Sequence, residues 1–208
     1  MLLPKSPKAG ASRFRSETRQ IQIVETVIAL AAKRGAGQIT MQEIANELGV
    51  TQGALFRHFP NKESIWLAAI VWVENELLGR LELAANQAAD PMDGLRRVFL
   101  AHVGFVVALP GVPRLIFNEL QQPADSPIKA AVRKLLERYR QLIHRLMDAA
   151  IDGGEIDRGI NVSAAATLFI GSIQGLVMQS MLADNVQTMP ASAEQVFPLF
   201  LRSLKAMP

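Results

Sequence analysis

The chain has 208 residues; half are hydrophobic and a fifth charged, which excludes a disordered chain and provides for a buried core. It has no cysteine, which excludes disulfides and thiolate metal sites and agrees with a cytoplasmic location. Residues 1–62 carry nine Lys or Arg against four Asp or Glu, and residues 63–208 carry thirteen against fifteen. A basic N-terminal part is typical of contact with a polyanion, although nine basic residues also suit an ordinary solvated surface.

The first fifteen residues, 1–15, are expected to form a disordered basic arm. Their three leading apolar residues are followed at once by proline and lysine, so no signal-peptide core is expected. Ser16 can cap a first helix that runs to about Arg34. Apolar residues recur at helical spacing from Ile21 to Ala31, which gives this helix one face to bury.

Two short helices follow in close succession. A capping box from Thr40 to Glu43 opens the first, which ends near Gly49. The second covers residues 51–58. Ala45 and Gly49, four residues apart, allow the two helices to pack closely at a steep angle, as a helix-turn-helix requires. An ordinary helical hairpin uses the same small residues, so the spacing alone leaves both interpretations open.

The rest of the chain is also helical by its spacing, and no segment shows the alternation of a strand. Asn61 can cap a long helix, and proline and glycine residues separate the helices that follow it. The helices expected here cover residues 62–89, 91–109, 112–121, 127–151, 163–183 and 191–206. We therefore expect an all-α fold of nine or ten helices, with one domain in residues 16–62 and a second in residues 63–208.

One stretch, residues 159–183, carries no charge and is long enough to span a bilayer. It contains six Ser, Thr and Gln side chains, and no cluster of Lys or Arg flanks it. A helix that is apolar nearly all round also suits a position between other helices. We expect a buried helix and no membrane contact.

The segment from Gly49 to Trp66 reads G-V-T-Q-G-A-L-F-R-H-F-P-N-K-E-S-I-W. It closely resembles the signature of the tetracycline-repressor (TetR) family, in which a Gly-Val-Ser/Thr turn leads into a Leu-Tyr-x-His-Phe recognition helix and a Lys-Glu pair. The match covers the helices from Ser16 to about Ala69. The resemblance implies a three-helix DNA-binding domain with a helix-turn-helix, followed by a helical ligand-binding and dimerisation domain. It also implies a regulator, most simply a repressor, that binds a palindromic operator as a homodimer and is released by a small apolar or amphipathic effector.

The resemblance assigns DNA contacts residue by residue. Thr40, at a helix N-terminus, is placed for a phosphate, and Arg57 is expected on a phosphate because it sits late in its short helix. Gln52 lies at the leading end of the recognition helix, where an amide can make paired hydrogen bonds to adenine. Phe56 stands where the family usually has a tyrosine that contacts a phosphate, so one hydrogen bond is lost. The expected contacts are Thr40, Thr51, Gln52, Gly53, Ala54, Phe56, Arg57, His58 and Lys62.

An effector cavity and a dimer interface are implied for the second domain. The cavity is expected around residues 91–109 and 112–121, and for its apolar members ordinary core packing is the alternative. Its expected lining is Phe99, His102, Phe105, Val106, Leu115, Phe117, Asn118 and Tyr139. Gly171 and Gly175 share one face of the uncharged helix, which is expected to form a four-helix bundle with residues 127–151 and a second copy. Packing within the chain is the alternative for these glycines.

An enzyme and a DNA-bound adaptor are the two alternative functions. An enzyme is disfavoured because the sequence has no Gly-rich phosphate loop, no zinc-ligand spacing and no nucleophile elbow, so we expect neither a cofactor nor a metal. A DNA-bound adaptor would keep the same fold but recruit a protein partner without a small-molecule ligand. A cavity in the free protein and a ligand-dependent loss of DNA binding would distinguish a sensor from an adaptor.

Overall fold

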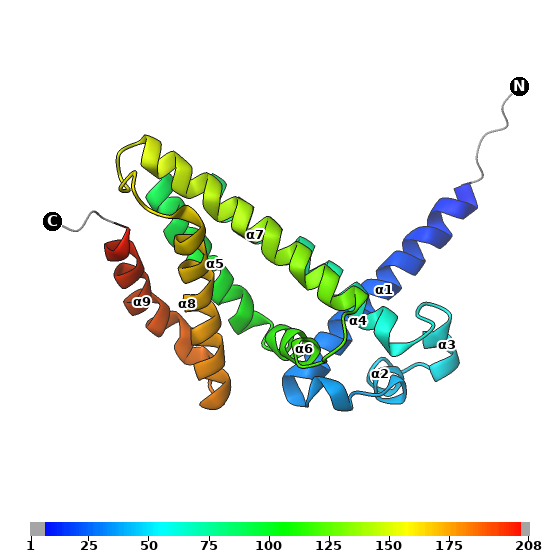
Figure 1. Cartoon of the computed structure of the whole chain (residues 1–208). Helices are drawn as coiled ribbons and strands as arrows, with labels where there is room; N and C mark the ends of the chain where they lie inside the picture. Colours follow the sequence, from blue (N-terminus) through cyan, green and yellow to red (C-terminus); the bar gives the residue numbers. More distant parts are fainter. Residues whose placement is uncertain (1–6, 205–208) are drawn as a thin grey trace, which may run out of the picture.

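The computed structural model describes residues 7–204, and in this range the chain forms nine α-helices, two short 3-10 helices and no strand (Figure 1). The all-α fold expected from the sequence is confirmed, and most of the expected helix ends lie close to the observed ones. The elements are α1 Pro7–Lys33, η1 Ala36–Gln38, α2 Met41–Glu47, α3 Gln52–Phe56, α4 Lys62–Asn86, α5 Pro91–Ala108, α6 Gly111–Leu120, α7 Pro127–Asp152, α8 Val162–Leu182, η2 Val186–Thr188 and α9 Met189–Ser203.

Most of the helices begin directly after a capping side chain. The side chain accepts a hydrogen bond from a backbone N–H of the first turn, which would otherwise have no partner. The residues that cap in this way are Thr40, Thr51, Asn61, Asp90, Ser126 and Asn161. These short-range signals explain why the sequence alone places most helix starts correctly.

The first helix begins at Pro7, well before the expected start at Ser16. The expectation of a disordered arm is therefore wrong for residues 7–15, which form the first turns of α1; residues 1–6 lie outside the described part of the chain. Proline suits the first position of a helix, and the Lys, Ala and Arg residues that follow are good helix formers. Local propensity thus favours the longer helix.

The N-terminal elements α1 to α3, here called the head, share a small apolar core. Ile44 of α2 and Leu55 of α3 are almost fully buried in it. Gly49, between α2 and α3, has a φ of +66°, a left-handed conformation that glycine adopts without steric cost. The Val50 N–H donates to the Ala45 carbonyl at 3.0 Å and closes this turn. The chain therefore reverses within a few residues, as the expected helix-turn-helix requires.

The remaining helices, α4 to α9, here called the body, pack as a bundle in which α5 contacts α4, α7, α8 and α9. An aromatic cluster joins three of these helices. The ring of Phe99 on α5 lies 5.3 Å from that of Phe169 on α8 and 5.2 Å from that of Phe197 on α9. The first pair is edge-to-face and the second is tilted, and such aromatic contacts add to the hydrophobic burial that stabilises the bundle.

A buried carboxylate fixes α4 against α7. Glu74 of α4 is only 2% exposed, and its carboxylate accepts a hydrogen bond from Arg138 of α7 at 2.8 Å. Lys134, one turn earlier on α7, lies 3.2 Å from the same carboxylate. The two cations keep the pKa of Glu74 below its usual value despite the opposing effect of burial. Since removing both cations would leave the Glu74 carboxylate buried without a partner, this cluster stabilises the contact between α4 and α7.

The short helix α6 is a part of the body that packs against the head. A Cβ on Gly111, in its first turn, would come 1.9 Å from the Ile28 carbonyl oxygen of α1, so only glycine permits this contact. Two turns later, the Oδ1 of Asn118 lies 3.0 Å from the position of a Cβ on Gly37, in η1. α6 therefore touches two elements of the head along one of its faces.

At the end of the body far from α2 and α3, α8 and α9 lie side by side (Figure 1). α8 is long and apolar enough to cross a membrane by length and composition, but its inner face packs against α7 and α9. Its outer face exposes Leu168, Met178 and Leu182, the last to 81%. A Cβ on Gly171 or Gly175 would meet nothing within 4 Å, so neither glycine serves a close contact within the described chain.

Candidate functional site

The expected recognition helix, α3, exposes one face to solvent, with no side chain at Gly53. Thr51 caps it by accepting a hydrogen bond from the Ala54 N–H at 3.2 Å. Gly53 and Arg57 are exposed, Phe56 is 44% exposed, and a Cβ on Gly53 would meet nothing within 4 Å. Because no side chain stands over Gly53, a nucleic acid can approach the helix backbone closely at this point.

Thr40 and Lys62 already have partners within the head. Thr40 accepts from the Glu43 N–H at 3.2 Å, and the Thr40 N–H donates to the Glu43 carboxylate at 2.9 Å, so the expected capping box is confirmed. The backbone hydrogen bond from Thr40 is the main reason that the pKa of Glu43 is lowered. Lys62 Nζ donates to the Gly37 carbonyl at 2.8 Å and lies 4.9 Å from the centre of the Trp66 ring. A phosphate at either residue would share or replace these contacts.

The other expected DNA contacts are half-buried. Gln52, Ala54 and His58 lie on α3 or directly after it, with part of each residue turned toward the small core of the head. Eight of the nine expected contacts therefore lie in the head, on α3, directly after it, or at the N-terminal ends of α2 and α3. The ninth, Lys62, is the first residue of α4 and donates a hydrogen bond to the head at Gly37.

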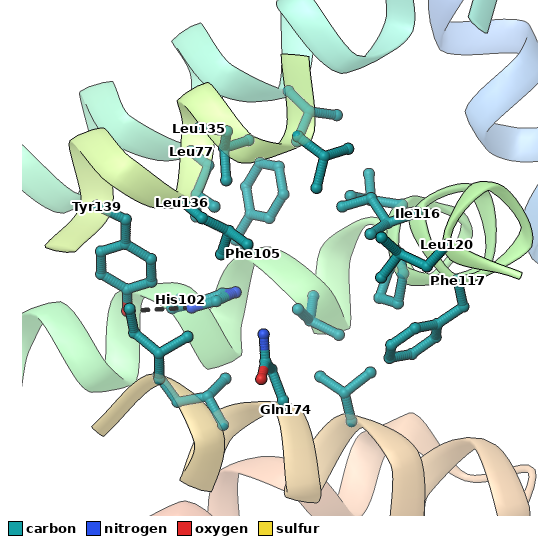
Figure 2. A pocket seen from close by; sticks show the side chains of 18 residues that line it. Leu77, His102, Phe105, Ile116, Phe117, Leu120, Leu135, Leu136, Tyr139 and Gln174 are labelled. Atoms are coloured by element: carbon teal, nitrogen blue, oxygen red, sulfur yellow. Dashed lines mark hydrogen bonds between the residues drawn. The ribbon is translucent and has the colours of Figure 1, made fainter. Parts of the chain in front are cut away.

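A cavity of about 100 Å³ lies in the body between α4, α5, α6, α7 and α8 (Figure 2). Its wall is apolar except for three uncharged polar side chains, and no Asp, Glu, Lys or Arg of the described chain lines it. The lining residues are Val73, Leu77, His102, Phe105, Val106, Val112, Pro113, Ile116, Phe117, Leu120, Val132, Leu135, Leu136, Tyr139, Ile170, Ile173, Gln174 and Val177.

Five of the eight residues expected at an effector site lie around this cavity, and three do not. The five are His102, Phe105, Val106, Phe117 and Tyr139. Phe99 is instead in the aromatic cluster with α8 and α9. Leu115 is buried but does not line the cavity, and Asn118 faces η1. Because successive residues of a helix are about 100° apart, the face of α6 that carries Ile116 and Leu120 excludes Leu115 and Asn118.

The polar groups of the cavity are neutral hydrogen-bonding groups. Nδ1 of His102 lies 3.1 Å from the Tyr139 hydroxyl, and the amide of Gln174 points into the cavity from the opposite side (Figure 2). Burial lowers the pKa of His102 to about 4 and raises the pKa of Tyr139 above its usual value. Both are therefore uncharged near pH 7. The second ring nitrogen of His102 stays available to a ligand, as donor or acceptor according to the tautomer.

Apart from Tyr139, the residues that α7 and α8 contribute to the cavity were not expected from the sequence. On α7, Val132, Leu135 and Leu136 precede Tyr139 at helical spacing. They share a helix face with Tyr139, so its expected position at the cavity could have indicated them. On α8, Gln174 is an amide in an uncharged helix, next to the apolar Ile173. No feature of the sequence shows that α8 faces α6 across a cavity.

Two regions of the chain match described protein families. Residues 23–69 match bacterial regulatory proteins of the tetR family, and residues 121–196 match the tetracyclin repressor-like C-terminal domain. The chain belongs to the TetR family. It is a DNA-binding transcriptional regulator, as the resemblance of residues 49–66 implied, and its relatives are regulators and not enzymes.

Several relatives extend over most of this TetR-family chain. It is 22% identical over 186 residues to the fatty acid metabolism regulator protein of Bacillus subtilis. The aligned region covers 89% of this chain and 95% of that protein. It is 22% identical over 178 residues to the nucleoid occlusion factor SlmA of Vibrio cholerae, covering 85% and 90% of the two chains. The crystal structure of FadR from Bacillus subtilis in complex with stearoyl-CoA has a TM-score of 0.77 at 22% identity, with coverage of 87% and 97%. This structural likeness establishes the fold.

Proposed function

We propose that the protein is a ligand-responsive repressor that binds a palindromic operator as a homodimer and is released by an apolar or amphipathic effector. The observation that carries this proposal is the position of α6. Ile116 and Phe117 of α6 face the cavity, whereas Gly111 and Asn118 of the same helix contact α1 and η1 of the head. A ligand that displaces α6 therefore acts on the head directly.

The size of the cavity supports such a displacement. Its volume of about 100 Å³ is below the roughly 150 Å³ that accommodates a benzene molecule, so a ligand with an alkyl chain has to widen it. α4 is tied to α7 through Glu74, while α6 is a single short helix. α6 is thus the helix that a bound ligand would displace. The ligand then stabilises a second arrangement of the head and shifts the population toward it.

The ligand named for the similar Bacillus subtilis structure, stearoyl-CoA, supports an effector with an acyl chain. The apolar wall of the cavity suits such a chain, and its neutral polar groups suit a carbonyl. We therefore propose acyl compounds as the first effectors to test.

We propose that the homodimer forms through the outer faces of α8 and α9, rather than through α8 and α7 as the sequence analysis expected. α8 exposes three large apolar side chains and α9 exposes Leu199 to 59%. The outer face of α7 carries charged residues, among them Arg133, Glu137 and Arg140. Homodimer interfaces are depleted of charge at their centre, which favours α8 and α9.

An adaptor function is the second candidate, because the chain is also similar to the nucleoid occlusion factor SlmA. An adaptor would bind DNA and a protein partner at once and would not respond to small molecules. The cavity beneath α6 favours the repressor, and the experiment that follows separates the two.

The proposal is tested by selecting operator sequences from random duplexes and then titrating the selected duplex with the protein. A repressor of this kind enriches an inverted repeat and loses affinity for it when decanoyl-CoA is added. Enrichment of an inverted repeat with no response to any acyl ligand would support the adaptor instead. Failure to enrich any sequence would contradict operator binding itself.

A further inference from the structure

A second cavity, of about 190 Å³, adjoins the first. The two share the side chains of Val106, Pro113 and Val177 as a common wall. The second cavity lies between the first turns of α6 and the C-terminal end of α8, and Ala32 of α1 closes its side toward the head. The two cavities are therefore separated only by these three side chains, and a ligand that spans both has to displace at least one of them.

The second cavity differs from the first because it contains a cation, the guanidinium of Arg114. The Arg114 side chain is 33% exposed, and its Nη2 lies 3.8 Å from the carboxylate of Asp184, which is 94% exposed. Such a long ion pair with a solvated partner contributes little and is readily exchanged. Asp184 is also the only acidic residue of the described chain that lines this cavity.

We propose that the second cavity is an anion subsite. The effector is an amphipathic anion whose apolar chain fills the first cavity and whose carboxylate or phosphate pairs with Arg114 in place of Asp184. The inference rests on the proposed effector function of the first cavity.

Desolvation explains why the charge lies in the second cavity. An anion enclosed in the first cavity would lose its water without meeting any cation, which is costly. His102 does not supply one, since burial keeps its pKa near 4. Arg114, by contrast, offers a guanidinium that matches the geometry of a carboxylate or phosphate.

The position of Arg114 also links anion binding to α6. Arg114 belongs to α6, whereas Asp184 follows α8. An anion that replaces Asp184 therefore binds to α6 itself, the same helix that the apolar chain of the effector contacts in the first cavity.

The test compares three ligands with the same ten-carbon chain by calorimetry: decanoate, decanoyl-CoA and 1-decanol. Each is titrated into the full chain and into Arg114→Gln, Asp184→Asn and Arg133→Gln. The last variant is a matched control, because Arg133 is an exposed arginine of α7 that pairs with Asp125 at 3.0 Å. Asn suits position 184 because Asp184 has a φ of +47°, which Asn tolerates. Decanoate and decanoyl-CoA distinguish a carboxylate from a phosphate as the anion.

We expect Arg114→Gln to weaken at least one anionic ligand about tenfold or more, with 1-decanol unchanged. Asp184→Asn should tighten the same anion, and Arg133→Gln should change nothing. Retained binding of 1-decanol also shows that the Arg114 variant is folded. Equal loss of anionic and neutral ligands, or no loss at all, would overturn the anion subsite while leaving the effector cavity intact. Absence of binding by all three ligands would overturn both proposals.

Discussion

Phe56 is the residue at which this chain departs from the TetR signature, and the structure shows that the departure lies on the surface. Its side chain is 44% exposed on α3, so a hydroxyl can be added without disturbing the core of the head. The apolar contacts that Phe56 shares with the family's tyrosine stay in place. We therefore expect specific DNA recognition to depend on other residues of α3 and the exchange to affect affinity alone.

Restoring the tyrosine gives the first prediction. Phe56→Tyr should tighten binding to operator and to unrelated duplexes alike, by about 0.5–1.5 kcal/mol, the net value of one hydrogen bond. Fluorescence anisotropy on both duplexes at several salt concentrations measures this change. A gain confined to the operator would mean that the hydroxyl reads a base, and no gain on either duplex would place residue 56 away from the DNA.

The neutral state of His102 predicts a pH dependence of stability. Burial lowers its pKa from 6.5 to about 4, so the unfolded chain takes up a proton here at a higher pH than the folded chain. The free energy of unfolding therefore falls as the pH falls from about 6.5 to about 4. We expect His102→Gln to remove about 1–3 kcal/mol of this loss. Urea unfolding of both proteins across this range decides the point, and parallel curves would contradict a neutral, buried imidazole.

At the scale of elements, α6 is the part of the molecule whose position matters most for the proposed response to an effector. Gly111 lets it approach the backbone of α1, and the residues on its other side line the cavity. A helix in contact with both regions transmits a displacement because packed side chains are not easily compressed. Any change that moves α6 away from α1 should mimic the effector.

Gly111→Ala is such a change. A Cβ 1.9 Å from the Ile28 carbonyl oxygen cannot be accommodated, so α6 has to shift, at a cost of about 1–3 kcal/mol. We expect weaker operator binding without any ligand, measured by titration. The matched control is Gly104→Ala on α5, an exposed glycine whose added Cβ meets nothing within 4 Å. The control should bind the operator normally and gain about 0.5–1 kcal/mol of stability; equal behaviour of the two variants would refute the role of α6.

The positions of the helices could be predicted from the sequence, but their orientation in the fold could not. Caps such as Thr40 and Asn61, together with apolar spacing, located the helices because both signals are local. Which face of α6 points toward the cavity cannot be read from local sequence, because it depends on the contact between Gly111 and α1. For this reason Leu115 and Asn118 were expected at the cavity but lie away from it. The cation at Arg114 was missed for the same reason, since its cavity needs α6 and α8 in their folded positions.

At the scale of the whole molecule, the proposed operator binding requires two heads, because one head reads only a few base pairs. Successive major grooves on one side of DNA are about 34–36 Å apart, and the proposed dimer would have to hold its two α3 helices at this spacing. In the single chain, α8 and α9 lie at the end of the molecule opposite α2 and α3 (Figure 1). A dimer formed through α8 and α9 would therefore place the two heads at its far ends. A small rotation of each body about this interface would then produce a larger change in the distance between the two heads.

The dimer surface is tested by Gly171→Leu combined with Gly175→Leu. Neither added side chain meets an atom within 4 Å of its Cβ, so the single chain should stay folded while the close approach of a second copy is blocked. We expect monomers in sedimentation and loss of specific operator binding. Gly79→Leu with Gly104→Leu, two open glycines on α4 and α5, should remain dimeric and bind the operator. A dimer that survives the first double substitution would place the interface elsewhere.

The coupling between the cavity and the spacing of the heads can be measured directly, because the chain has no cysteine. Gly53→Cys introduces one labelling site per chain on the exposed face of α3, where an added Cβ meets nothing. Pulsed electron spin resonance then gives the distance between the two recognition helices, with and without decanoyl-CoA whose binding is verified by calorimetry. A ligand-free distance compatible with successive major grooves and a shift of several ångström on binding are the predicted result. An unchanged distance in the fully liganded dimer would contradict the account.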